Sequence, residues 1–178
     1  VRLGLAKAMV ARRDVAGAIA ELQKATELDP KNAAAQYELG TVLLRMKGDA
    51  ASAVAPLQKA VALEPANTAY ATALGSALVG AQQFAPAIDL LTRLTALPDY
   101  KQPDGFVSLG QAYVQGKRYK DAVPVLEKAT AIAPQNADAW ATLGWAYFGM
   151  KDAAKFKDAA GKAGTLGYKE PTRLAYLK

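Results

Sequence analysis

Apolar residues recur three and four positions apart through residues 104–132, which is the spacing of an amphipathic α-helix. The pattern predicts one helix from about Asp104 to Gln115 and a second from about Tyr119 to Ile132, with a turn at Gly116-Lys117-Arg118. The residues that carry the pattern are Val107, Gly110, Tyr113 and Val114, then Ala122, Val123, Leu126 and Ala129. Gly110 and Ala122 are small enough to let two antiparallel helices approach closely, so this segment is expected to form a helical hairpin.

Similar copies of this pattern return about every 34 to 35 residues along the chain. The copies are Leu109-Gly110, Tyr113, Ala122, Leu126, Ala129 and Pro134; Leu143-Gly144; Leu74-Gly75, Phe84, Ala87 and Leu91; Leu39-Gly40, Ala53, Leu57, Ala60 and Pro65; and Leu5-Ala6, Ala18, Leu22, Ala25 and Pro30. Small residues at the eighth, twentieth and twenty-seventh places, with proline near the thirty-second, resemble the tetratricopeptide repeat.

The resemblance implies an all-α fold, a right-handed α-solenoid of about five helical hairpins in a single array over residues 1–178. Counting back from the prolines places the repeats at about 1–32, 33–67, 68–102, 103–136 and 137–170. Residues 171–178 resume an apolar rhythm with Leu174 and Leu177, and are expected to form a C-terminal capping helix or the start of a sixth repeat.

Local signals support these boundaries. Asn32, Asn67 and Asn136 are placed to cap the helix that follows each of them. Pro56 and Pro124 fall near the start of the second helix of their repeats, where we expect a bend but no break.

Two segments depart from the regular pattern. The linker over residues 97–104 is longer and more polar than the other joints, and is interpreted as an extended loop, with a hinge as the alternative. In the fifth repeat, Phe156 stands where alanine is usual, and three glycines thin the second helix.

Composition limits the chemistry. The chain has no cysteine and no histidine, which excludes disulfides, thiolate metal sites and the commonest neutral-pH general base. No metal, cofactor or catalytic activity is expected. No apolar run is long enough for a transmembrane segment. The chain begins at Val1, which indicates a fragment or a processed product, so the compartment stays open between cytoplasm and periplasm.

By family resemblance, the first helix of each repeat lines a concave groove that binds a protein or peptide partner. Carried onto this sequence, the partner-binding residues are Lys7, Tyr37, Glu38, Thr41, Arg45, Thr72, Ser76, Ser108, Gln111, Gln115, Trp145 and Phe148. A known subclass grips the C-terminal carboxylate of chaperone tails with Lys, Asn and Arg at fixed groove places. Those places are not filled suitably here, so an Hsp70 or Hsp90 tail is not the expected ligand.

The aromatic residues divide into two groups. Trp145 and Phe148 are predicted either to anchor a partner in the groove or to be covered by Leu174, Tyr176 and Leu177. Trp140, Tyr147 and Tyr113 fall on faces that pack within the repeat, and are predicted to be core residues.

These features favour a noncatalytic protein–protein interaction scaffold, serving as an adaptor or assembly factor in a larger, bacterial complex. A self-associating scaffold, and hence a homo-oligomer, is the alternative. Nucleic-acid binding is disfavoured although the net charge is +6, because the second and third repeats each carry as many acidic as basic residues.

Overall fold

The computed structural model describes residues 2–168 of the 178-residue chain. The predicted capping segment 171–178, with Leu174, Tyr176 and Leu177, lies outside the described residues. In the part described, the regular structure is entirely helical, as the spacing of apolar residues predicts.

Ten helices are present between residues 2 and 168, and a short turn separates the first and second helix of each predicted repeat. They are α1 (Arg2–Ala11), α2 (Val15–Leu28), α3 (Ala33–Arg45), α4 (Ala50–Leu63), α5 (Thr68–Gly80), α6 (Phe84–Thr95), α7 (Pro103–Gln115), α8 (Tyr119–Ile132), α9 (Ala137–Gly149) and α10 (Ala153–Thr165). The hairpin predicted from residues 104–132 corresponds to α7 and α8, with bounds that differ by at most one residue.

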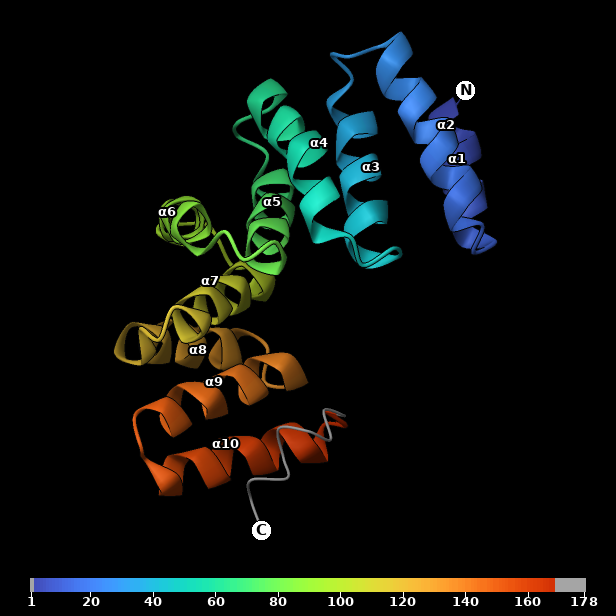
Figure 1. Ribbon diagram of the computed structural model, residues 1–178. Coiled ribbons are helices and arrows are strands. Elements are labelled where there is room, and N and C mark those ends of the chain that lie inside the picture. Colours follow the sequence, from blue (N-terminus) through green and yellow to red (C-terminus); the bar gives the residue numbers. More distant parts are fainter. Residues whose placement is uncertain (1, 169–178) are drawn as a thin grey trace. The chain divides into compact units, whose positions relative to one another are not determined.

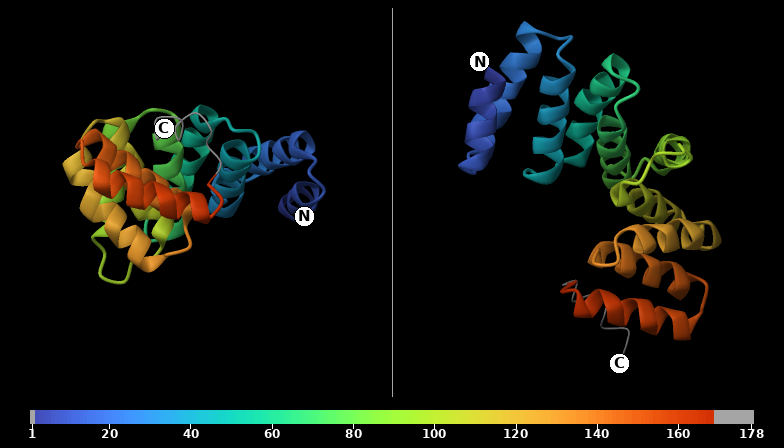
Figure 2. Two further views of the ribbon diagram at one scale, coloured as in Figure 1. Left: turned by 90° about the horizontal axis from the view of Figure 1, so that it is seen from below. Right: turned by 180° about the vertical axis from the view of Figure 1, so that it is seen from behind.

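The helices fall into two compact units, which divide between Gln83 and Phe84. In the first unit, consecutive helices from α1 to α5 contact one another, and α3 also touches α5. In the second unit α6 to α10 do the same, and α7 also touches α9 (Figures 1 and 2). The division lies inside the third predicted repeat, a feature that the sequence did not indicate, and the repeat boundaries themselves stay a prediction.

Asparagine side chains begin the first helices of three hairpins. The Oδ1 atom of Asn32 accepts a hydrogen bond from the backbone N–H of Ala35 at 2.9 Å, and Asn136 does the same for Ala139 at 3.0 Å. Asn67 caps α5 in the same way. Each bond satisfies an N–H group that has no partner within the helix, so the predicted caps are confirmed.

The turn within each hairpin depends on one residue with positive φ. This residue is Arg13, Gly48, Gln82, Lys117 or Lys151, with φ between 59° and 71°. Only glycine adopts this left-handed conformation without steric cost, yet four of the five turns use a longer side chain. The backbone conformation of this turn is therefore the same in all five turns, although the residue at this position differs.

A repeated pair of small and large residues is buried on each of the helices α2, α4, α6 and α8. The alanine of each pair is 0% exposed and the leucine four positions later is at most 1% exposed. The pairs are Ala18 and Leu22, Ala53 and Leu57, Ala87 and Leu91, and Ala122 and Leu126. In the second and fourth hairpins the leucine side chain packs directly on a glycine of the first helix, Gly40 or Gly110.

In the fifth hairpin the two sizes are exchanged. Phe156 replaces the alanine and Ala160 replaces the leucine, and both are buried. The larger ring at one position therefore compensates for the smaller side chain at the other, which explains how phenylalanine is accommodated where alanine is usual. As a result, the space above Gly144 is not filled by a leucine.

Pro56 and Pro124 lie inside continuous helices, α4 and α8, so the prediction that they would not break their helices is confirmed. The loop between α6 and α7 lies within the second unit. Tyr100 fixes this loop, because its ring is buried, lies against Gly105 and approaches Phe106 with centroids 5.6 Å apart. This anchoring favours the extended loop over the hinge.

Candidate functional site

In the first unit, the predicted binding residues form small clusters on the first helices of the hairpins. Lys7 of α1 and Glu38 of α3 make an ion pair with Nζ and Oε1 3.0 Å apart. The ring of Tyr37 stacks on Tyr70 with centroids 4.7 Å apart, and burial is the main cause that raises the pKa of Tyr70. Tyr37 is partly buried against this neighbour, so only part of its ring remains for a ligand.

Among the residues predicted to line the groove, the hydroxyl groups of Thr41 and Ser76 donate hydrogen bonds to backbone carbonyls of their own helices. Thr41 donates to the carbonyl of Glu38 at 3.0 Å, and Ser76 donates to the carbonyl of Thr72 at 3.1 Å. Thr72 and Ser108 are buried, with 7% and 5% of their surface exposed. These two residues therefore offer little surface to a partner, whereas Arg45 and Gln115 are exposed at the ends of α3 and α7.

In the second unit, Trp145, Phe148 and Phe156 form an aromatic cluster between α9 and α10. The centroids of Trp145 and Phe148 are 5.5 Å apart with nearly perpendicular rings, and Phe148 lies 5.3 Å from Phe156. Phe156 is buried and Trp145 is partly buried, while Phe148 is 47% exposed. Such edge-to-face contacts hold the exposed ring in a defined orientation.

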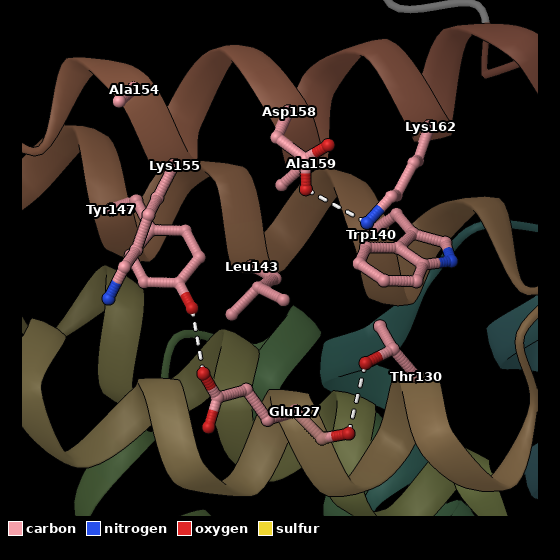
Figure 3. Close-up of a pocket in the computed structure, with 10 residues that line it drawn as sticks. All are labelled: Glu127, Thr130, Trp140, Leu143, Tyr147, Ala154, Lys155, Asp158, Ala159 and Lys162. Carbon is pink, nitrogen blue, oxygen red and sulfur yellow. Dashed lines mark hydrogen bonds and ion pairs between the residues drawn. The ribbon is translucent and has the colours of Figure 1, made fainter.

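A pocket of about 490 Å³ lies among α8, α9 and α10 (Figure 3). The second helices α8 and α10 form its two walls, and α9 lies between them. Its lining consists of Glu127, Thr130, Trp140, Leu143, Tyr147, Ala154, Lys155, Asp158, Ala159 and Lys162.

Charged side chains and aromatic rings alternate around this pocket. The hydroxyl of Tyr147 donates to Oε1 of Glu127 at 2.8 Å, and Lys162 pairs with Asp158 at 2.8 Å. The Lys162 ammonium also lies 4.4 Å from the centroid of the Trp140 ring. In Figure 3 these contacts lie on either side of Leu143.

Tyr147 has a pKa well above the ordinary value of a tyrosine. Burial, followed by the hydrogen bond to Glu127, raises the pKa of Tyr147 to about 12. The phenol is therefore a neutral hydrogen-bond donor at physiological pH, and Glu127 is held as its acceptor.

The core predictions for the aromatic residues are mostly confirmed. Tyr113 and Tyr147 are buried. The prediction was wrong for Trp140, which is only partly buried and lines the pocket. Its indole N–H donates to the carbonyl of Pro134 at 2.8 Å, so the ring is turned toward the end of α8 instead of into the hairpin.

The pocket as a whole was missed by sequence reasoning, although α10 contains a usable signal. Lys155, Asp158 and Lys162 are spaced three and four residues apart, which places their side chains on one face of a helix. The sequence could not show that this face lies against Trp140, because that depends on how α9 and α10 pack.

Among the residues from 2 to 168, acidic side chains do not gather into a group of three or more that could hold a metal ion. The same part of the chain contains no helix with the length and apolar character needed to cross a bilayer.

Comparison with known proteins identifies the repeat. The family model described as "TPR repeat" matches residues 6–47 and 110–151. The chain contains tetratricopeptide repeats at these two positions. A search of curated proteins found no match.

Solved structures agree with this assignment over nearly the whole chain. A crystal structure of MamA is 27% identical with a TM-score of 0.77, and the match covers 90% of this chain and 93% of MamA. YrrB, described as a TPR protein with an unusual peptide-binding site, is 23% identical with a TM-score of 0.75 over 99% of this chain and 90% of its own. PilF of Pseudomonas aeruginosa is 19% identical with a TM-score of 0.79 over 99% and 82%.

These matches confirm the predicted fold class, an all-α solenoid of tetratricopeptide hairpins. Proteins of this fold are interaction scaffolds, which is the general class that the sequence predicted. The likenesses to YrrB and PilF, at less than 25% identity, concern the fold alone.

Proposed function

We propose that the chain is a noncatalytic scaffold that binds a peptide or protein segment on the first-helix faces of its repeats, as an adaptor or assembly factor of a larger complex. The observation that carries this proposal is the aromatic cluster on α9, where Phe148 is 47% exposed beside the partly buried Trp145. Aromatic side chains held rigidly at a surface are effective anchors for binding, because they bury a large area and lose little conformational entropy.

The neighbouring helix supplies polar groups for the same ligand. Gln111 and Gln115 are spaced four residues apart on α7, and α7 contacts α9. Amide side chains both donate and accept hydrogen bonds, which suits them to the main chain of an extended peptide. An apolar anchor beside such amides favours a segment with a large hydrophobic side chain flanked by an extended backbone.

The comparisons add a precedent for this use of the fold. YrrB, which shares the fold, is described as having an unusual peptide-binding site. That description concerns YrrB, but it supports a search for peptide ligands of the present protein.

A selection from a random peptide library on the immobilised full chain tests the proposal. Recovered peptides would be measured by fluorescence anisotropy against the wild type and against Phe148→Ser. Leu97→Ser is the matched control, because Leu97 has the same exposed fraction, 47%, in the loop between α6 and α7. We expect Phe148→Ser to weaken binding by about tenfold or more, equal to about 1.4 kcal/mol, and Leu97→Ser to leave it unchanged.

Failure to recover any peptide that binds above background would contradict the proposal. Equal affinity of the wild type and a folded Phe148→Ser variant would contradict the assignment of the α9 aromatic cluster. Circular dichroism would check the fold of both variants, and light scattering would show whether self-association competes with the peptide.

A further inference from the structure

The pocket among α8, α9 and α10 lies away from the face proposed above for peptide binding. A helix turns about 100° per residue, so Trp140, Leu143 and Tyr147 point roughly 140° away from Trp145 and Phe148 around α9. The pocket residues also come from α8 and α10, the second helices of two hairpins. This site is therefore separate from the first-helix face, and its ligand is a separate question.

The ring faces of the pocket already hold cations that belong to the protein. The ammonium of Lys162 lies 4.4 Å from the centroid of Trp140, and that of Lys155 lies 5.3 Å from the centroid of Tyr147 (Figure 3). Both distances fall within the range in which a cation is attracted to the face of an aromatic ring. Both rings therefore already make cation–π contacts, and each can bind a cation on its face.

These internal contacts are weak enough to be exchanged. The side chains of Lys162 and Asp158 are 48% and 65% exposed, and they pair across one helical turn. Solvent-exposed pairs and exposed cation–ring contacts each change an equilibrium constant by less than roughly tenfold. Lys162 has a flexible four-carbon stem, so it can leave the ring and remain solvated.

Displacing Lys162 also changes the charge of the pocket. Asp158 loses its partner, and the lining then holds two carboxylates, Asp158 and Glu127, against the single ammonium of Lys155. The two carboxylates lie on opposite walls, α10 and α8, with Leu143 of α9 between them (Figure 3). This remaining lining, with two carboxylates and one ammonium, favours an incoming cation over an incoming anion.

We propose that this pocket binds an arginine side chain of a partner protein. Its guanidinium would stack on Trp140 and pair with Asp158, in the positions that Lys162 occupies here. The aliphatic stem would lie against Leu143 and Ala159, which form the apolar part of the lining. Arginine suits this site better than lysine because its planar group stacks on a ring and can bind a carboxylate through two N–H groups.

The volume of about 490 Å³ exceeds the space that one side chain fills, so residues flanking the arginine are also accommodated. Thr130 lies at the α8 wall near Trp140, with its hydroxyl donating to the carbonyl of Glu127 at 2.9 Å. Leu143 and Ala154 add apolar lining beside it, so the ligand is an arginine within a short segment with apolar flanks.

The test uses NMR titration of the full chain with the probe peptide acetyl-Leu-Arg-Leu-amide. The control peptide carries citrulline, which has the shape of arginine without its charge. The indole N–H of Trp140 reports on the site, since its hydrogen bond to Pro134 holds the ring in place. We expect saturable shifts with the arginine peptide and at least fivefold weaker binding of the citrulline peptide.

Two variants test the role of the internal lysine. Lys162→Met keeps the apolar stem and removes the competing ammonium, so it should tighten arginine binding by roughly threefold. Asp158→Asn should weaken it, and Leu97→Ser, in the loop between α6 and α7, should leave it unchanged. Equal binding of both peptides, weaker binding to Lys162→Met, or stronger binding of acetyl-Leu-Glu-Leu-amide would each overturn the proposal.

Discussion

Gly110 and Gly144 occupy the same place in consecutive hairpins, yet alanine should have opposite effects at the two positions. A Cβ atom at Gly110 would overlap three carbon atoms of Leu126, which is fully buried and has no free space to move into. At Gly144 the nearest atoms to a new Cβ, which belong to Ala160 and Phe156, are both 3.6 Å away, an ordinary van der Waals contact. The exchange of large and small residues in the fifth hairpin creates this difference.

The magnitudes follow from two opposing contributions. Replacing glycine by alanine inside a helix stabilises it by up to about 1 kcal/mol. Forcing an extra carbon into a filled core costs about 1 to 3 kcal/mol. We therefore expect Gly144→Ala to raise the free energy of unfolding by up to about 1 kcal/mol, and Gly110→Ala to lower it by about 1 to 2 kcal/mol.

Urea unfolding followed by tryptophan fluorescence measures both effects, because Trp140 and Trp145 lie in the same unit as Gly110 and Gly144. A double-mutant cycle with Leu126→Ala isolates the contact. In that background the overlap is gone, so Gly110→Ala should become neutral or stabilising. A Gly110→Ala variant at least as stable as the wild type would refute this explanation of the packing.

Three further changes test other contacts. Glu127→Gln should lower the pKa of Tyr147 from about 12, while burial keeps this pKa above its ordinary value of 10.0. Phenolate absorbance measures the pKa, with the Tyr147→Phe variant as the reference that lacks this phenol. Because this pKa is raised on folding, the stability that Tyr147 contributes is complete below pH 10 and is lost as the pH rises to about 12. In the Tyr147→Phe variant, the free energy of unfolding should therefore fall less steeply between pH 10 and 12. Lys117→Gly should stabilise the chain in thermal unfolding by up to about 1 kcal/mol, since Lys117 has a φ of 59°; an unchanged or lower melting temperature would argue against strain at this turn. Asn136→Ala should cost about 1 kcal/mol by removing the cap on α9, whereas no loss in urea unfolding would mean that the cap is replaced by water.

The fold was predictable because its signals are local and repeated. The spacing of Ala122, Leu126 and Ala129 recurs in several copies, so the helices and their buried faces could be read without knowledge of tertiary contacts. The caps at Asn32 and Asn136 are local in the same sense. The left-handed turn residues were not predictable, because Arg13, Gln82 and Lys117 have no preference for positive φ.

The candidate sites were only partly predictable. Family resemblance predicted that Trp145 and Phe148 either anchor a partner in the groove or are covered by the C-terminal segment, but it could not show that Thr72 and Ser108 would be buried. The pocket at Trp140 depends on the packing of three helices, and especially on the placement of Lys162 over the indole ring. Sequence spacing alone gives the face of each helix, not which faces meet.

Site-specific photocrosslinking tests the central claim, recognition of a protein segment on the first-helix faces, most directly. A photoreactive phenylalanine analogue would replace Phe148 or Gln115, which are exposed on α9 and α7, in the full chain within a lysate of its source. Lys120 and Lys157, exposed on the second helices α8 and α10, are the controls. We predict that a common partner is crosslinked at Phe148 and Gln115 and absent at the two controls. Crosslinks confined to the control positions would contradict the account.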